Sequence, residues 1–115
     1  MWRLPSRPTL EVKAMQIIEL NAEKWKSVFD FYNALLSAIG APAEHGKNPN
    51  ALVDSMIWGG LNSVEPPYTI RISGTATLPN DVRNHIELIK EDLARGRQEY
   101  HERCAGNVDV SIEII

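Results

Sequence analysis

Residues 44–56 read EHGKNPNALVDSM, and they place a stiff turn directly in front of a short helix. Asn48 is a favoured helix N-cap. Pro49 suits the first helical position, because the N–H group that proline lacks would have no partner there. We expect the helix to run from Pro49 to about Trp58 and to end at the Gly-Gly pair that follows.

The predicted helix carries a polar face beside its buried edge. Leu52 and Met56 are four residues apart and would form the buried edge. The residues expected to face outward are Asn50, Val53, Asp54 and Ile57, and the loop that leads to this face contributes Glu44, His45 and Lys47. A carboxylate that the cap holds in a fixed direction loses little entropy on binding. This face therefore favours a protein partner, with an ordinary solvated helix surface as the alternative.

The chain before this stretch predicts a strand and a helix. Residues 15–20, MQIIEL, are apolar and rich in β-branched side chains, as is typical of a short strand. Residues 27–40 carry the stripe of an amphipathic helix, formed by Val28, Phe31, Tyr32, Leu35, Leu36 and Ile39. Ser27 and Asp30 predict a capping box at its start, and Gly40 marks its end.

The chain after this stretch predicts a strand, a long helical region and a final strand. The first strand is Tyr68–Ser73. The helical region opens at Pro79 and reaches residues 106–107, with a break or bend expected near Gly96. Val108–Ile115 alternates apolar and polar side chains and would be the last strand.

This order of elements predicts an α/β fold. Strands that are separated by helices imply parallel pairing. We expect one small three-stranded parallel sheet with the helices packed mainly on one face. The predicted domain spans residues 15–115, and residues 1–14 would form a loosely ordered N-terminal extension.

Composition limits the class of protein. With 115 residues, 43% of them hydrophobic and 23% charged, one globular domain is the simplest expectation. The net charge of −3 disfavours direct binding of nucleic acid, which needs clustered cations. The single cysteine excludes an internal disulfide and fits a reducing compartment. We find neither an apolar run long enough for a membrane span nor a secretory signal, so a cytoplasmic location is expected.

Motifs of common enzymes and metal sites do not occur in the sequence. There is no P-loop, GxGxxG, CxxC or HExxH, and the three histidines have no metal-ligand spacing. We therefore expect neither a cofactor nor a metal. Cys104 is expected to be a small packing residue. A small hydrolase that uses Glu102, His101 or Cys104 stays open as an alternative.

The segment HGKNPNALVDSM resembles the central motif of the barstar family, the intracellular inhibitors of secreted bacterial ribonucleases. That motif is an aromatic pair followed by Gly-x-Asn-x-Asp-Ala-Leu-Trp-Asp. Residues 17–42, IIELNAEKWKSVFDFYNALLSAIGAP, are similar to the first strand and helix of the family, and residues 106–115, GNVDVSIEII, are similar to its closing strand. The resemblance covers about residues 15–115, and it is loose in the helical region after Ser73.

The resemblance implies roles for individual residues. In the family, the acidic helix and its preceding loop fill the ribonuclease active site, where carboxylates take the place of RNA phosphates. Asp54 falls on the main phosphate-mimicking acid, and Glu102 falls on a second acid that contacts the enzyme. The residues with structural roles at the turn and in the helix are Gly46, Asn48, Pro49, Ala51 and Leu52.

This chain also departs from the family motif. Asn50 replaces its first acid, Val53 replaces its tryptophan, and Glu44 and His45 replace its aromatic pair. The departures imply poor inhibition of the classical target and a different partner. We expect a bacterial immunity protein that binds one nuclease toxin, in particular a ribonuclease, one-to-one. The second alternative is an interaction module of the same fold whose partner is not a nuclease.

Overall fold

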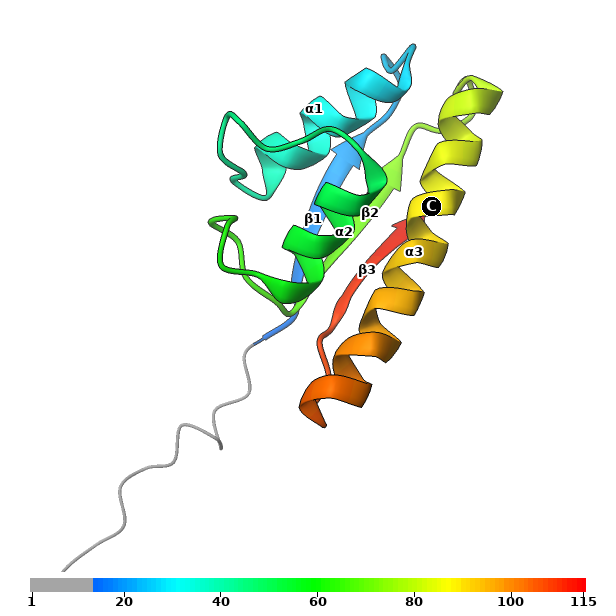
Figure 1. Cartoon of the computed structure of the whole chain (residues 1–115). Helices are drawn as coiled ribbons and strands as arrows, with labels where there is room; N and C mark the ends of the chain where they lie inside the picture. Colours follow the sequence, from blue (N-terminus) through cyan, green and yellow to red (C-terminus); the bar gives the residue numbers. More distant parts are fainter. Residues whose placement is uncertain (1–13) are drawn as a thin grey trace, which may run out of the picture.

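A computed structural model describes residues 14–115, so all but the last residue of the predicted N-terminal extension lies outside the described part. Six elements follow one another in the predicted order, and Figure 1 shows their arrangement. They are β1 (Gln16–Asn21), α1 (Val28–Ala38), α2 (Pro49–Trp58), β2 (Tyr68–Ser73), α3 (Asn80–Cys104) and β3 (Val110–Ile114). The ends of β2 are those predicted, and the ends of β1 and β3 differ from the predicted ones by one or two residues.

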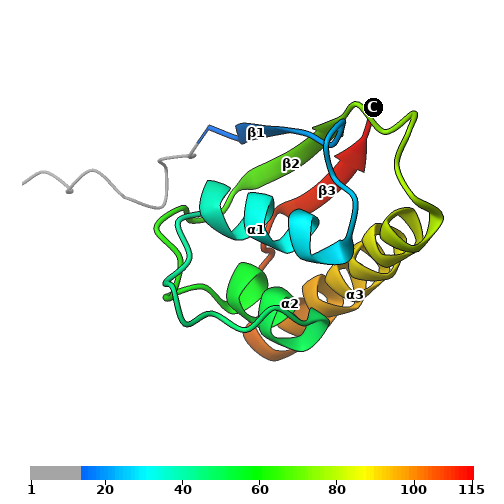
Figure 2. The ribbon, with the colours of Figure 1, turned by 90° about the horizontal axis from the view of Figure 1, so that it is seen from above.

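The three strands form one parallel sheet in the order β1-β2-β3. Parallel neighbours need crossover connections, and α1 with α2 makes the first crossover while α3 makes the second. All three helices lie on the same face of the sheet, as Figure 2 shows. The predicted α/β fold class is therefore confirmed.

Helix α1 shows why the sequence forms this layer. Its capping box is complete, because the Ser27 hydroxyl accepts a bond from the Asp30 N–H while the Asp30 carboxylate accepts one from the Ser27 N–H. Phe31, Leu35 and Ile39 on its stripe are fully buried. Burying three large apolar side chains in this way gives α1 its fixed place in the core.

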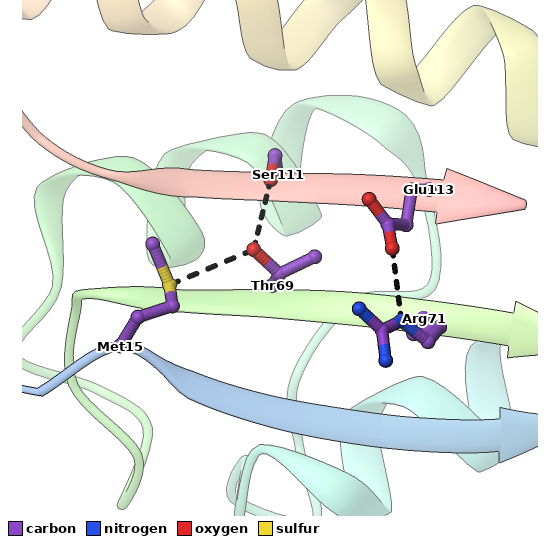
Figure 3. Close-up of polar contacts among 5 residues, drawn as sticks. All are labelled: Met15, Thr69, Arg71, Ser111 and Glu113. Carbon is purple, nitrogen blue, oxygen red and sulfur yellow. Dashed lines mark hydrogen bonds and ion pairs between the residues drawn. The ribbon is translucent and has the colours of Figure 1, made fainter.

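The two faces of the sheet differ sharply. Tyr68, Ile70 and Ile72 of the central strand point toward the helices and are buried. Figure 3 shows the opposite, open face, where Thr69 and Arg71 lie. Alternation along a strand explains this division, because successive side chains point to opposite faces.

Helix α3 corrects two predictions. It continues through Gly96, so the expected break is wrong. Cys104 lies exposed at the end of the helix and is not a packing residue. Four apolar residues, Val82, Ile86, Ile89 and Leu93, anchor the first half of the helix in the core.

No helix among residues 14–115 is both long enough and apolar enough to cross a membrane, since the long α3 is largely polar.

Candidate partner-binding site

The N-terminal end of α2 has the geometry that its sequence predicts. Asn48 Oδ1 accepts a hydrogen bond of 2.9 Å from the Ala51 N–H, and Pro49 occupies the first turn. A Cβ atom at Gly46 would lie 2.9 Å from Asn48 Nδ2 and 3.2 Å from Ala51 Cβ. Glycine is thus required for the loop to approach the helix this closely. Leu52 is fully buried and holds the helix against the core.

His45 is buried under α2 and does not face outward as predicted. Only 7% of it is exposed, and its Nε2 lies 2.7 Å from the Ser55 hydroxyl while its Nδ1 lies 2.7 Å from the Gly46 carbonyl. Asn62 Nδ2 donates a further bond to the Ser55 hydroxyl. A buried imidazole needs such partners. His45 therefore ties the loop to the helix instead of offering itself to a partner.

Ile57 and Val53 pack against α3, and the structure corrects their predicted outward position. Ile57 is 2% exposed and Val53 is half-buried. A Cβ atom built on Gly96 would lie 3.1 Å from Ile57 Cγ1 and 3.2 Å from Val53 Cγ1. The missing side chain of Gly96 lets α2 and α3 approach closely, and the two apolar residues fill that contact.

Asp54 and Asn50 remain exposed on the outer side of α2. Asp54 takes part in none of the ion pairs between described residues. It stands on a ridge between two hollows: one is the groove between α2 and α3, and the other lies between α2 and the loop that contains Glu44. An acid in this position is accessible from both sides.

The groove between α2 and α3 brings further acids to Asp54. It has a volume of about 300 Å³, and α3 contributes Asp92, Arg95 and Glu99 to its wall. Asp92 pairs with Arg95, and Glu99 lies 3.4 Å from Arg103 Nη2. Because Asp92 and Glu99 are each paired with an arginine of α3, Asp54 is the unpaired negative charge of this groove.

Glu102 does not line either hollow beside Asp54. Its carboxylate accepts a hydrogen bond of 3.4 Å from Gln98 on the surface of α3. The residues that the structure brings to Asp54 from α3 are Asp92 and Glu99, which the sequence reading missed. Their spacing on one helical face, together with Gly96 between them, is the signal that could have identified them.

Lys47 lies 4.9 Å from the centre of the exposed Phe29 ring, at the outer side of the loop.

Behind the groove, Asp92 acts on an aromatic pair that joins α1 to α3. Burial, and next the charge of Asp92, raise the pKa of Tyr32 to about 12. Burial lowers the pKa of His85 although the Asp92 carboxylate opposes this. A neutral His85 can accept the bond of 2.6 Å from the Tyr32 hydroxyl. This contact fixes the position of α3 relative to α1.

The residues considered for a hydrolase do not assemble into a reactive group. His101 Nδ1 lies 3.0 Å from the Gly106 carbonyl, and Glu102 is bonded to Gln98. With Cys104 exposed, these side chains make no hydrogen bonds to one another within residues 14–115. In the same residues, no group of three His, Cys, Asp or Glu side chains is arranged to hold a metal ion.

The described chain is thus an α/β domain with a small parallel sheet covered on one face and a capped helix that presents an unpaired acid. The family model described as Barstar (barnase inhibitor) matches residues 15–109. The chain therefore belongs to the barstar family, whose description is that of an inhibitor. A search of curated proteins found no match.

Proposed function

We propose that this chain inhibits a nuclease toxin, in particular a ribonuclease, by binding one-to-one over its active site. It would act in the bacterial cytoplasm as an immunity protein and would be no enzyme itself. The observation that carries the proposal is Asp54, an exposed and unpaired carboxylate on a capped helix of a barstar-family chain.

The local structure supports this role through rigidity. Asn48 caps α2, and His45 ties the entering loop to Ser55 of the same helix. Val53 and Ile57 hold α2 against Gly96 of α3. Because the surroundings of Asp54 are fixed before binding, little entropy is lost when a partner docks.

The charge around Asp54 supports a cationic target. An active site that binds RNA phosphates presents cations, and carboxylates can take the place of those phosphates through charge-assisted hydrogen bonds. Asp92 and Glu99 are paired with arginines, so Asp54 is the lining carboxylate that keeps a free negative potential in the groove. Such a potential also accelerates encounter with a basic protein.

Position 50 favours a second candidate, an interaction module of this fold with a partner that is not a nuclease. Asn50 stands where the resemblance places an acid, and Val53 packs toward α3 where the resemblance places a tryptophan. The outer side of α2 thus keeps one carboxylate. A partner with a less basic surface would suit this side of the helix.

A titration distinguishes the two candidates. The full chain is titrated into candidate nucleases, and hydrolysis of a fluorogenic RNA or DNA oligonucleotide is followed. Inhibition that is complete at one equivalent, with a one-to-one complex in sedimentation, supports the inhibitor. A complex in which the nuclease remains active would overturn the active-site proposal and favour the module.

A further inference from the structure

A second hollow lies at the C-terminal end of α2, beyond the groove that contains Asp54. Its volume is about 590 Å³. Trp58 lines both hollows and so connects the two surfaces. The other walls used below come from α3 (Tyr100), from the segment before β2 (Glu65, Pro66 and Pro67) and from the residue before β3 (Asp109).

Aromatic rings form one wall of this hollow. Trp58 is 40% exposed and packs against Tyr100 with ring centres 4.9 Å apart. The guanidinium carbon of Arg103 lies 5.8 Å from the centre of the Trp58 ring. The chain itself therefore places a cation at this ring, which is the arrangement that favours cation–π attraction.

The charged residues that line the hollow are both acids, while the Arg103 guanidinium lies at its Trp58 wall. Glu65 and Asp109 are exposed lining residues, and no Lys, Arg or His is found among the residues that line it. Neither acid takes part in an ion pair between described residues. Two free carboxylates beside exposed aromatic rings attract a cation and repel an anion.

The end of α2 adds partial negative charge at the same place. Within residues 14–115, the last hydrogen bond of the helix runs from the Gly59 N–H to the Ser55 carbonyl. The later carbonyls of the helix end at the hollow, where a helix C-terminus is electronegative. A Cβ atom at Gly59 or Gly60 would meet nothing within 4 Å, so the floor is open to an incoming side chain.

We propose that this hollow receives an arginine or lysine side chain of the partner protein that binds at Asp54. The aliphatic stem would lie along the rings and prolines, and the charged head would reach Glu65 and Asp109. The identity of the partner rests on the proposed function, whereas the affinity of the hollow for a cation does not. The interface would therefore extend past α2 to the start of β3.

The test uses the full chain, labelled with ¹⁵N, and the probe acetyl-Gly-Arg-Gly-amide. The control probe carries citrulline in place of arginine, which keeps the shape and removes the charge. We expect the arginine peptide to shift the Trp58 indole N–H and the Gly59 and Gly60 amides, with a dissociation constant on the order of millimolar. The citrulline peptide should give shifts that are several-fold smaller.

Two charge-matched variants complete the test. Glu65→Gln with Asp109→Asn should weaken the arginine peptide several-fold, whereas Glu19→Gln with Glu91→Gln, at exposed positions outside the hollow, should not. Equal shifts from both peptides, or unchanged binding in the Glu65→Gln/Asp109→Asn variant, would overturn the proposal. A chain that binds the peptide but inhibits no nuclease would refute the proposed function and leave the cation site standing.

Discussion

The open face of the sheet and the outer side of α2 are both polar, but they differ in whether their charged side chains form ion pairs within the chain. On the sheet, the Arg71 Nε donates a bond of 2.8 Å to the Glu113 carboxylate, and Thr69 bonds to Ser111 and to Met15 (Figure 3). On α2, no cation of the described chain pairs with Asp54. The charges of Arg71 and Glu113 on the sheet face are satisfied by partners within the chain. The fixed carboxylate of Asp54 has no such partner, so it is available to another molecule.

The largest expected effect is that of Asp54→Ala on partner binding. Truncating one member of a desolvated charge pair costs about 2–5 kcal/mol of affinity, a range that complexes of this same family helped to define, so it is carried over by analogy. The free energy of unfolding should change by less than about 0.5 kcal/mol, because the acid has no partner in the free chain. Calorimetric titration against the partner and a urea melt measure the two quantities.

Glu19→Ala is the matched control for Asp54→Ala. It removes the same charge from the open face of the sheet, at an exposed position on β1. We expect its affinity to equal that of the wild type within a few-fold, and only the wild-type interaction with Asp54 should weaken steeply as salt rises. Equal losses in both variants would mean that net charge, and not the position of Asp54, governs binding.

The next effect concerns the contact with Gly96 of α3 that fixes the orientation of α2. Gly96→Leu would force a side chain between Ile57 and Val53, and overpacking of this kind outweighs the gain in helix propensity. We expect a net loss of about 1–2 kcal/mol in the free energy of unfolding. Ala94→Leu, at an exposed position of the same helix, should leave stability nearly unchanged. If the two variants melt alike, the close approach of α2 and α3 does not hold in solution.

A smaller effect is expected at position 50. Asn50→Asp adds a carboxylate next to Asp54 without changing the packing, since Asn50 is exposed. A partner surface that is complementary to asparagine has no cation opposite position 50, so the new carboxylate would be buried without a partner. Affinity should therefore fall about tenfold, or about 1.4 kcal/mol. Surface plasmon resonance measures this change. A partner that is indifferent to it would place position 50 outside the interface.

The smallest effect is expected from the charges that are already paired. The Glu113 side chain is 48% exposed and that of Arg71 is 37% exposed. Exposed ion pairs contribute about 0–1 kcal/mol, so Glu113→Ala should lower the free energy of unfolding within that range and leave partner binding unchanged. A urea melt beside a binding titration tests both parts, and reduced binding would assign the open sheet face to the interface.

Local patterns in the sequence correctly predicted the features that depend on interactions between residues close in the chain. The stripe from Phe31 to Ile39 and the caps at Ser27 and Asn48 depend on residues within one or two turns, and the structure contains all of them. The succession of strands and helices along the chain and the parallel pairing of the strands followed from the same patterns. Propensity and periodicity are sufficient for this level of structure.

The misplaced residues are those whose environment comes from distant parts of the chain. Gly96 indicated a helix break, but it is the point where α3 meets Val53 and Ile57. His45 looked like a loop residue that faces outward, but it is buried beneath the helix, where its Nε2 lies 2.7 Å from the Ser55 hydroxyl. Asp92 and Glu99 share one face of α3 by their spacing in the sequence, but the packing of α3 against α2 is what brings that face to Asp54.

The connection between β1 and β2 has a consequence for the timing of protection. Gln16 pairs with Tyr68, and both α1 and α2 lie in the chain between these two residues. The whole segment must therefore close into a loop before β1 can pair with β2, and such long closures slow the folding of parallel sheets. The helix that carries Asp54 is enclosed in that loop, so a newly made chain acquires its binding surface in the same step that closes the sheet. On the proposed function, a cell would be protected from its toxin only after this step, and the rate of loop closure would set how far inhibition lags behind synthesis.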